Sequence, residues 1–115
     1  MIKRKSSYPI QQNENMRGGD GVVKIEHLLT PEEMNEKGRL YAKITLEPGC
    51  SIGYHVHKGE MESFYIICGE AEVSDNGEIV TVSAGDTILT QSETGHSVKN
   101  SGSAALEMIA QILYN

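Results

Sequence analysis

The sequence has 115 residues, of which 38% are hydrophobic, and it contains 12 glycines and no tryptophan. This is the size of one domain with its own core, and the composition favours a compact, turn-rich protein over a disordered one. The formal net charge of −6 argues against a nucleic-acid partner, because phosphate binding requires a basic surface.

The apolar runs of the chain are too short to span a bilayer, so we expect no membrane association. The basic N-terminus is not followed by the apolar core of a signal peptide. The two cysteines, Cys50 and Cys68, do not make a disulfide framework. Together these features predict a cytoplasmic protein.

Residues 1–21 are polar and glycine-rich, and they predict an N-terminal arm that precedes a β-barrel domain over residues 22–115. The domain begins with a predicted strand over residues 22–29, whose apolar residues alternate. Thr30 is followed by proline and by Glu33, which is the signature of a helix start. We therefore expect one or two turns of helix that end at Gly38.

From Arg39 onward the sequence predicts only strands and turns. Residues 40–46 alternate between apolar and polar side chains, as in a half-buried strand. Further short strands are predicted over residues 62–68, 71–74, 78–82, 87–90, 97–99 and 105–114. Many short strands at regular spacing indicate an all-β sandwich or barrel.

The predicted last strand carries apolar side chains on both faces. Leu106, Met108, Ala110 and Ile112 alternate with a second set that includes Ile109 and Leu113. A strand that is covered on both faces shows such a nearly continuous apolar run. One face is expected to fill the barrel, and the other to pack on a second subunit or under the N-terminal arm. We expect a homodimer.

A candidate metal site stands out between Gly49 and Gly69. His55 and His57 are two residues apart, so in a strand their imidazoles share one face. Glu62 lies on the next predicted strand, and a third imidazole, His96, lies further along the chain. Burying these groups without a cation would leave costly polar atoms unpaired. Three imidazoles and one carboxylate are a strong ligand set for a divalent transition metal.

These residues occur in a pattern that resembles the cupins, in particular small single-domain microbial cupins. The first cupin motif has a glycine, His-x-His, a glutamate and a second glycine at spacings that this chain matches throughout residues 49–69. The second motif is matched at Gly85, His96 and Asn100, whereas Gln91 replaces the usual proline and Glu93 the usual glycine. The two motifs cover about half of the chain.

The resemblance implies a jelly-roll β-barrel, also called a double-stranded β-helix. It also implies one bound divalent transition metal ion, such as Mn, Fe, Zn or Ni, held by His55, His57, Glu62 and His96. In small cupins the N-terminal arm often crosses to a partner subunit. His27 precedes both motifs and has no spacing partner, so we expect it to be structural or exposed.

Several other residues near the predicted site are open to two readings. Glu60 is either a solvated loop charge, which we favour, or an acid or base near the metal. Arg17 is either a solvated arm residue or a ligand for a carboxylate. Cys68 is expected to be a small buried hydrophobe on the same face as Glu62, together with Phe64 and Ile66. Five further polar residues are candidates for orienting a ligand: Tyr41, Lys43, Tyr54, Tyr65 and Gln111. The sequence does not decide whether these side chains face the inside or the outside of the barrel.

Three classes of function fit the sequence. The first is a metal-dependent enzyme that acts on a small organic acid, sugar or phenol as a dioxygenase, decarboxylase or isomerase. The second is a small-molecule binding or sensing protein in which the metal orients the ligand. The third is a structural cupin, and the complete ligand set argues against it. Because jelly-roll folds host many chemistries, the fold alone does not choose among them.

Overall fold

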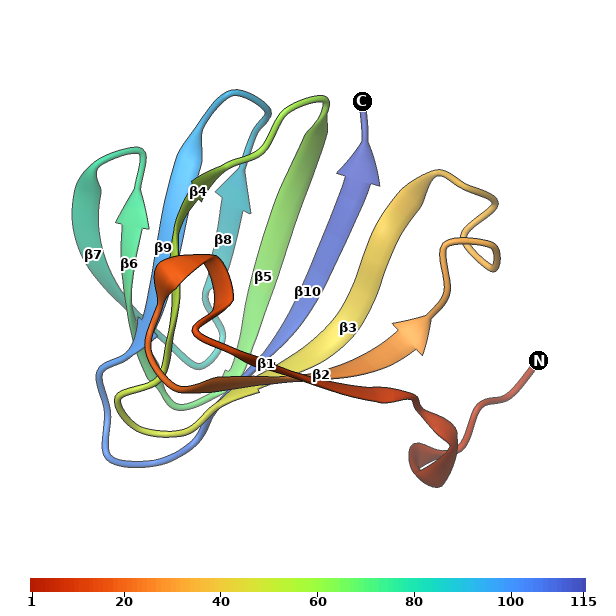
Figure 1. Ribbon diagram of the computed structural model, residues 1–115, viewed down its shortest axis with the longest axis horizontal. Helices are drawn as coiled ribbons and strands as arrows, with labels where there is room; N and C mark the ends of the chain where they lie inside the picture. The colour runs from red at the N-terminus through yellow and green to blue at the C-terminus, as the bar shows by residue number, and fades with distance from the viewer.

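The computed structural model describes all residues, 1–115, and its regular structure is almost entirely antiparallel β-sheet (Figure 1). Two short 3-10 turns, η1 and η2, occupy Lys5–Ser7 and Met16–Gly18. The strands are β1 Ile10–Glu14, β2 Val22–Leu29, β3 Gly38–Leu46, β4 Ser51–Val56, β5 Glu60–Cys68, β6 Glu70–Asp75, β7 Glu78–Ser83, β8 Thr87–Thr90, β9 Gly95–Asn100 and β10 Leu106–Tyr114. No helix is long and apolar enough to cross a membrane.

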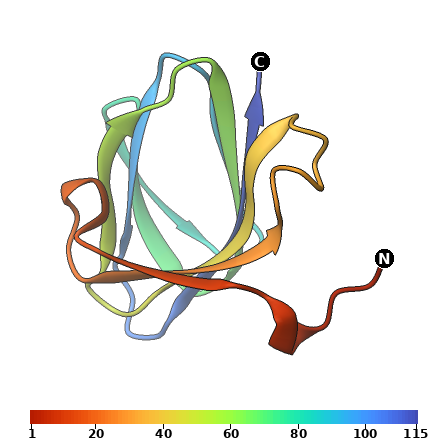
Figure 2. The same cartoon turned by 45° about the vertical axis from the view of Figure 1, so that its right-hand side comes forward.

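The strands form two sheets that face each other, as Figure 2 shows. One sheet has the order β1-β2-β3-β10-β5-β8, and the other has the order β4-β9-β6-β7. Consecutive strands in the chain often lie in different sheets, so the chain repeatedly crosses between them. This is the jelly-roll arrangement that the sequence predicts.

The alternation of apolar residues explains how the sheets bury a common core. On β3 the side chains of Ala42, Ile44 and Leu46 are buried, and their neighbours in sequence are only half-buried. The alternating set of β10 is also buried, so the predicted inward face of this strand is confirmed. Ile52, Val73 and Val98 of the smaller sheet join the same core cluster. Burying each such side chain contributes about 1.5 to 3 kcal/mol.

The predicted short helix after Thr30 does not form. Its capping box is present, because the backbone N–H of Glu33 donates to Thr30 Oγ1 at 3.1 Å and the N–H of Thr30 donates to Glu33 Oε1 at 2.8 Å. However, Asn35 and Glu36 adopt left-handed φ angles of 55° and 59°. These angles stop propagation, so residues 31–36 make only a turn.

Cys68 is exposed, in contrast to the buried position that we expected from its period with Glu62. Phe64 and Ile66 do face the core, as predicted. Between Ile66 and Cys68 the pairing of β5 with β10 shifts register, from Met108↔Ile66 to Glu107↔Cys68. This bulge interrupts the alternation, and the thiol of Cys68 lies 3.4 Å from the Glu107 carboxylate at the surface.

The segment predicted as an arm contains a strand that the sequence did not indicate. β1 pairs with β2 in register Ile10↔Glu26 to Glu14↔Val22, at the edge of the larger sheet. The arm therefore lengthens the sheet beyond β2 and does not lie over the outer face of β10. It then turns through η2, which contacts β4 (Figure 1).

Candidate metal centre

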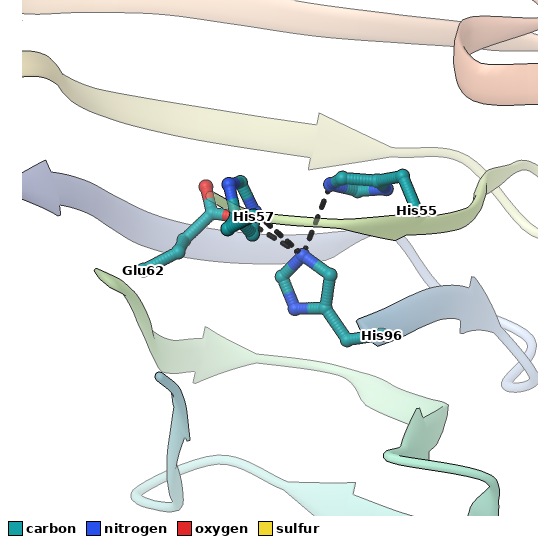
Figure 3. Close-up of side chains that lie close together, drawn as sticks. All are labelled: His55, His57, Glu62 and His96. Atoms are coloured by element: carbon teal, nitrogen blue, oxygen red, sulfur yellow. Dashed lines mark hydrogen bonds and ion pairs between the residues drawn. The ribbon is translucent and has the colours of Figure 1, made fainter. Parts of the chain in front are cut away.

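The four residues that the sequence selects as metal ligands meet inside the barrel. His55 and His57 lie on or directly after β4, Glu62 lies on β5 and His96 on β9. His55 and His96 are paired across neighbouring strands, which places their imidazoles side by side. One ligand atom from each of the four residues lies within 4.8 Å of all the others. Figure 3 shows the three rings and the carboxylate pointing toward one another.

The polar atoms in this cluster are very close together. The Nε2 atom of His96 lies 3.1 Å from the Nε2 atoms of both His57 and His55. The nearest Glu62 oxygen lies 2.9 Å from His57 Nε2 and 3.0 Å from His96 Nε2. His57, Glu62 and His96 are at most 4% exposed. These three side chains are therefore largely shielded from solvent.

The outward nitrogen of each imidazole has its own partner. His55 Nδ1 donates to the Gly53 carbonyl and His57 Nδ1 donates to Glu60, both at 2.8 Å. His96 Nδ1 is hydrogen-bonded to Thr90 Oγ1 at 2.9 Å. A carbonyl or carboxylate can only accept, so His55 and His57 in their neutral forms carry their proton on Nδ1 and aim the Nε2 lone pair inward. Converging lone pairs and a carboxylate oxygen suit a cation, and such partners typically orient metal-binding histidines.

Glu60 is a buried member of this arrangement and not the solvated charge that we favoured. It is 8% exposed and accepts from Arg39 Nε at 2.8 Å and from Arg39 Nη2 at 2.7 Å, in addition to His57. The bidentate hydrogen bonds from Arg39 lower the pKa of Glu60 to about 2, which keeps it ionised. Glu60 precedes Glu62 by two residues, so both carboxylates share the inward face of β5.

The other ionisable groups respond to burial and to each other. Burial lowers the pKa of His55, because the charged imidazolium is poorly solvated there. The hydrogen bond with Glu62 raises the pKa of His57. Burial opposes ionisation of Glu62, but the hydrogen bonds that His57 and His96 donate when protonated at Nε2 outweigh it and lower the pKa of this carboxyl group. The cluster thus favours an anionic Glu62 beside cationic charge.

The turn before His96 forms although two motif positions depart from the cupin pattern. Glu93 adopts φ 70°, a conformation that glycine adopts without strain, and its N–H donates to the His57 carbonyl at 2.7 Å. Thr94 closes the turn by donating from its hydroxyl to the Gln91 carbonyl at 2.6 Å. Phe64 stacks on the His96 ring at a centroid distance of 5.5 Å. The position of His96 is therefore fixed from both sides.

A cavity of about 190 Å³ opens beside the cluster and includes His55, His57, Glu62 and His96 in its wall. Much of the remaining wall is apolar, as the sequence predicted from Phe64. None of the five polar residues that we considered for orienting a ligand lines it. Tyr54 and Tyr65, for example, are 54% and 50% exposed on the outside. The polar wall residues are instead Gln11, Asn13, Arg17, His27, Arg39 and Ser97.

Sequence reasoning missed several of these positions. His27 is half-buried in the cavity wall and is hydrogen-bonded to Gln11 at 2.9 Å, so it is not simply a surface residue. Gln11 and Asn13 lie on β1, and their spacing of two was the only signal that they share a face. Thr90, which supports His96, is 1% exposed, and its spacing of two from Ile88 could have identified it.

The comparisons with known proteins place this architecture in one family. A sequence model of the family described as "Cupin domain" matches residues 42–112. The chain is 44% identical over 113 residues to the oxalate-binding protein of Thermotoga maritima, covering 98% of this chain and 93% of that protein. It is 28% identical over 85 residues to the tetracenomycin polyketide synthase protein TcmJ of Streptomyces glaucescens, covering 74% of this chain and 57% of that protein.

Solved structures show the same fold. The crystal structure of a predicted oxalate decarboxylase from Thermotoga maritima superposes with a TM-score of 0.96, at 43% identity and full coverage of both chains. The cupin domain of Cnp3 from Schizosaccharomyces pombe superposes with a TM-score of 0.78, at 18% identity, covering 99% of this chain and 74% of that chain. At 18% identity, the similarity to the Cnp3 domain concerns the fold alone.

Proposed function

This chain belongs to the cupin family, and we propose that it binds a divalent transition metal through His55, His57, Glu62 and His96 and, at that metal, a short organic acid of the oxalate type. The observation that carries the proposal is the convergence of three imidazole Nε2 atoms and a carboxylate oxygen, while the Nδ1 atoms have other partners. Manganese, iron, zinc and nickel all accept such nitrogen and oxygen ligands.

The chemistry of the cavity supports a small anionic ligand. When bound, the ion supplies a Lewis acid that attracts carboxylate oxygens. The cavity is small, and Arg17 and Arg39 contribute cationic groups to its wall. The relative that is 44% identical over nearly its whole length is an oxalate-binding protein, which agrees with this ligand class.

Binding is favoured over turnover by the residues that line the cavity. Glu62 is the only carboxylate in the wall, and as a metal ligand it is not free to transfer a proton. Decarboxylation of oxalate to formate and carbon dioxide consumes one proton, which a residue beside the ligand would have to supply. His27 is the only titratable wall residue apart from the ligands and the two arginines, and it is hydrogen-bonded to Gln11.

The test is a calorimetric titration of oxalate into metal-free protein and into protein reloaded with Mn²⁺. We expect binding only to the loaded protein, and we expect His96→Ala to abolish it because one ligand is lost. Equal binding to metal-free and loaded protein would refute metal-dependent binding. Release of carbon dioxide or formate in the same mixtures would show that the chain is instead a decarboxylase.

The homodimer and the cytoplasmic location expected from the sequence stay predictions. The outer face of β10 presents half-buried Ile109 and Leu113, next to exposed Tyr65 and Leu89 of β5 and β8. The N-terminal arm of the same chain pairs with β2, so it does not cover this face. Covering it with a second copy would bury these side chains.

A further inference from the structure

The N-terminal arm supplies one wall of the metal-site cavity. Gln11 and Asn13 of β1 and Met16 and Arg17 of η2 all line this cavity. Figures 1 and 2 show the arm running along β2 and then looping back beside β4, the strand that carries His55. The arm therefore brings side chains from the start of the chain to the ligand space.

The turn that carries Arg17 is tightly docked on β4. The N–H of Asp20 donates to Ser51 Oγ at 2.9 Å, and the N–H of Ser51 donates to the Asp20 carbonyl at 2.8 Å. A Cβ atom on Gly53 would lie 2.1 Å from the Arg17 carbonyl oxygen, so only glycine permits this approach. Contacts this close fix where the Arg17 backbone sits relative to the metal site.

Arg17 itself adopts a strained backbone conformation. Its φ of 55° lies in the left-handed region that non-glycine residues rarely occupy. Such a conformation persists where surrounding contacts hold it, and conformations of this kind cluster at functional sites. Here the docked turn holds it, and the Arg17 side chain, although exposed, contributes a cationic group to the cavity wall.

The guanidinium of Arg17 is the free cation of the cavity. All ion pairs of the chain involve other residues, and Arg17 makes no side-chain hydrogen bond within it. Arg39, the other wall arginine, is bound in bidentate fashion by Glu60. Only Arg17 can therefore give its charge to a ligand without breaking an existing pair.

Gln11, Asn13 and His27 line the same cavity as Arg17 and are linked to one another by hydrogen bonds. His27 Nε2 is hydrogen-bonded to Gln11 Oε1 at 2.9 Å, and Gln11 Nε2 donates to Asn13 Oδ1 at 3.0 Å. Each amide oxygen thus accepts one hydrogen bond within the wall. The NH₂ group of Asn13 also donates to Met16 Sδ at 3.7 Å, so each amide keeps one N–H group for a ligand. This wall suits an anion better than a neutral or cationic molecule.

We propose that Arg17 determines specificity for a dianion, by binding the carboxylate oxygens of a short dicarboxylate that the metal leaves uncoordinated. This inference rests on the proposed function. A divalent ion, Glu62 and Arg17 together carry a net charge of about +2, since the charges of Arg39 and Glu60 cancel. A dicarboxylate balances this charge, whereas a monocarboxylate leaves one positive charge without a partner.

The test compares oxalate and formate binding to Mn²⁺-loaded wild type, Arg17→Gln and Arg4→Gln by calorimetry. Arg4 is an exposed arm arginine outside the cavity wall, so its variant has the same charge change without the contact. We expect Arg17→Gln to weaken oxalate binding by about 10- to 100-fold, the usual worth of a hydrogen-bonded charge. Formate affinity and bound manganese per chain should stay at the wild-type values. Arg17→Lys should recover part of the oxalate affinity.

Three results would overturn the inference. Oxalate binding to Arg17→Gln equal to that of Arg4→Gln would show that Arg17 makes no contact with the ligand. An equal loss for oxalate and formate would show that it does not select dianions. Loss of manganese from Arg17→Gln would show that it acts on the metal site instead. If the loaded wild type binds no oxalate, the proposed function itself fails, and this outcome is separate because it does not depend on any variant.

Discussion

Replacing Glu60 by glutamine tests how strongly the surroundings of the ligands support the metal centre. Glu60 joins Arg39 to His57 through hydrogen bonds of 2.7 to 2.8 Å, at 8% exposure. Glutamine has nearly the same shape, but it loses the charge and turns an NH₂ group toward one of these donors. Loss of such a partner of a metal-binding histidine weakens metal affinity by about 10- to 100-fold, or about 1.4 to 2.7 kcal/mol.

The assay is competition for Mn²⁺ or Zn²⁺ between the protein and chelators of graded affinity. Glu78→Gln is the matched control, because Glu78 is exposed on β7 and its substitution removes the same charge away from the site. We expect a weaker chelator to remove the metal from Glu60→Gln than is needed to remove it from the control or from the wild type. Metal affinity of Glu60→Gln equal to that of Glu78→Gln would refute the argument that Glu60 positions His57.

Two further predictions concern the docked arm and the effect of pH. Gly53→Ala should move the Arg17 turn by about 1.3 Å, because its Cβ would lie 2.1 Å from the Arg17 carbonyl and ordinary contact begins at 3.4 Å. We expect the free energy of unfolding in urea to fall by about 1 to 3 kcal/mol and oxalate binding to weaken. Neither change should occur in Gly102→Ala, because the nearest contact of its added Cβ would be 3.5 Å. Because the hydrogen bond with Glu62 raises the pKa of His57 above 6.5, protons should compete with metal and its affinity should fall as pH decreases. Chelator competition between about pH 5 and 8 checks this, and a flat profile would contradict it.

The sequence predicts most strands of the larger sheet and the placement of His55, His57 and Glu62 because these depend on local periodicity, whereas His96 is identified through the second motif. His55 and His57 share a face through their spacing, and Glu62 is brought to them by a short loop between neighbouring segments. The buried sets of β3 and β10 follow from the same rule. Short-range patterns of this kind are set by strand geometry and are largely independent of distant contacts.

The remaining features depend on interactions that a single sequence does not encode locally. The exposed position of Cys68 follows from a bulge against β10, and bulges also interrupt the pairing of β4 with β9. The role of Glu60 depends on Arg39, which is 21 residues away. The arm residues line the cavity only because β1 pairs with β2 and η2 docks on β4. Long-range packing determines these positions, and the spacing of residues in the sequence does not reveal that packing.

The most direct test of the metal centre is the metal-to-chain ratio of protein purified without a metal-affinity tag, measured by elemental analysis. We expect near-stoichiometric divalent metal in the wild type and in His27→Ala, since His27 lines the cavity but lies outside the ligand cluster. His57→Ala should lose most of the metal, because it removes one of the converging nitrogens. Equal metal content in the His57 and His27 variants would contradict the assignment of His55, His57, Glu62 and His96 as a metal site.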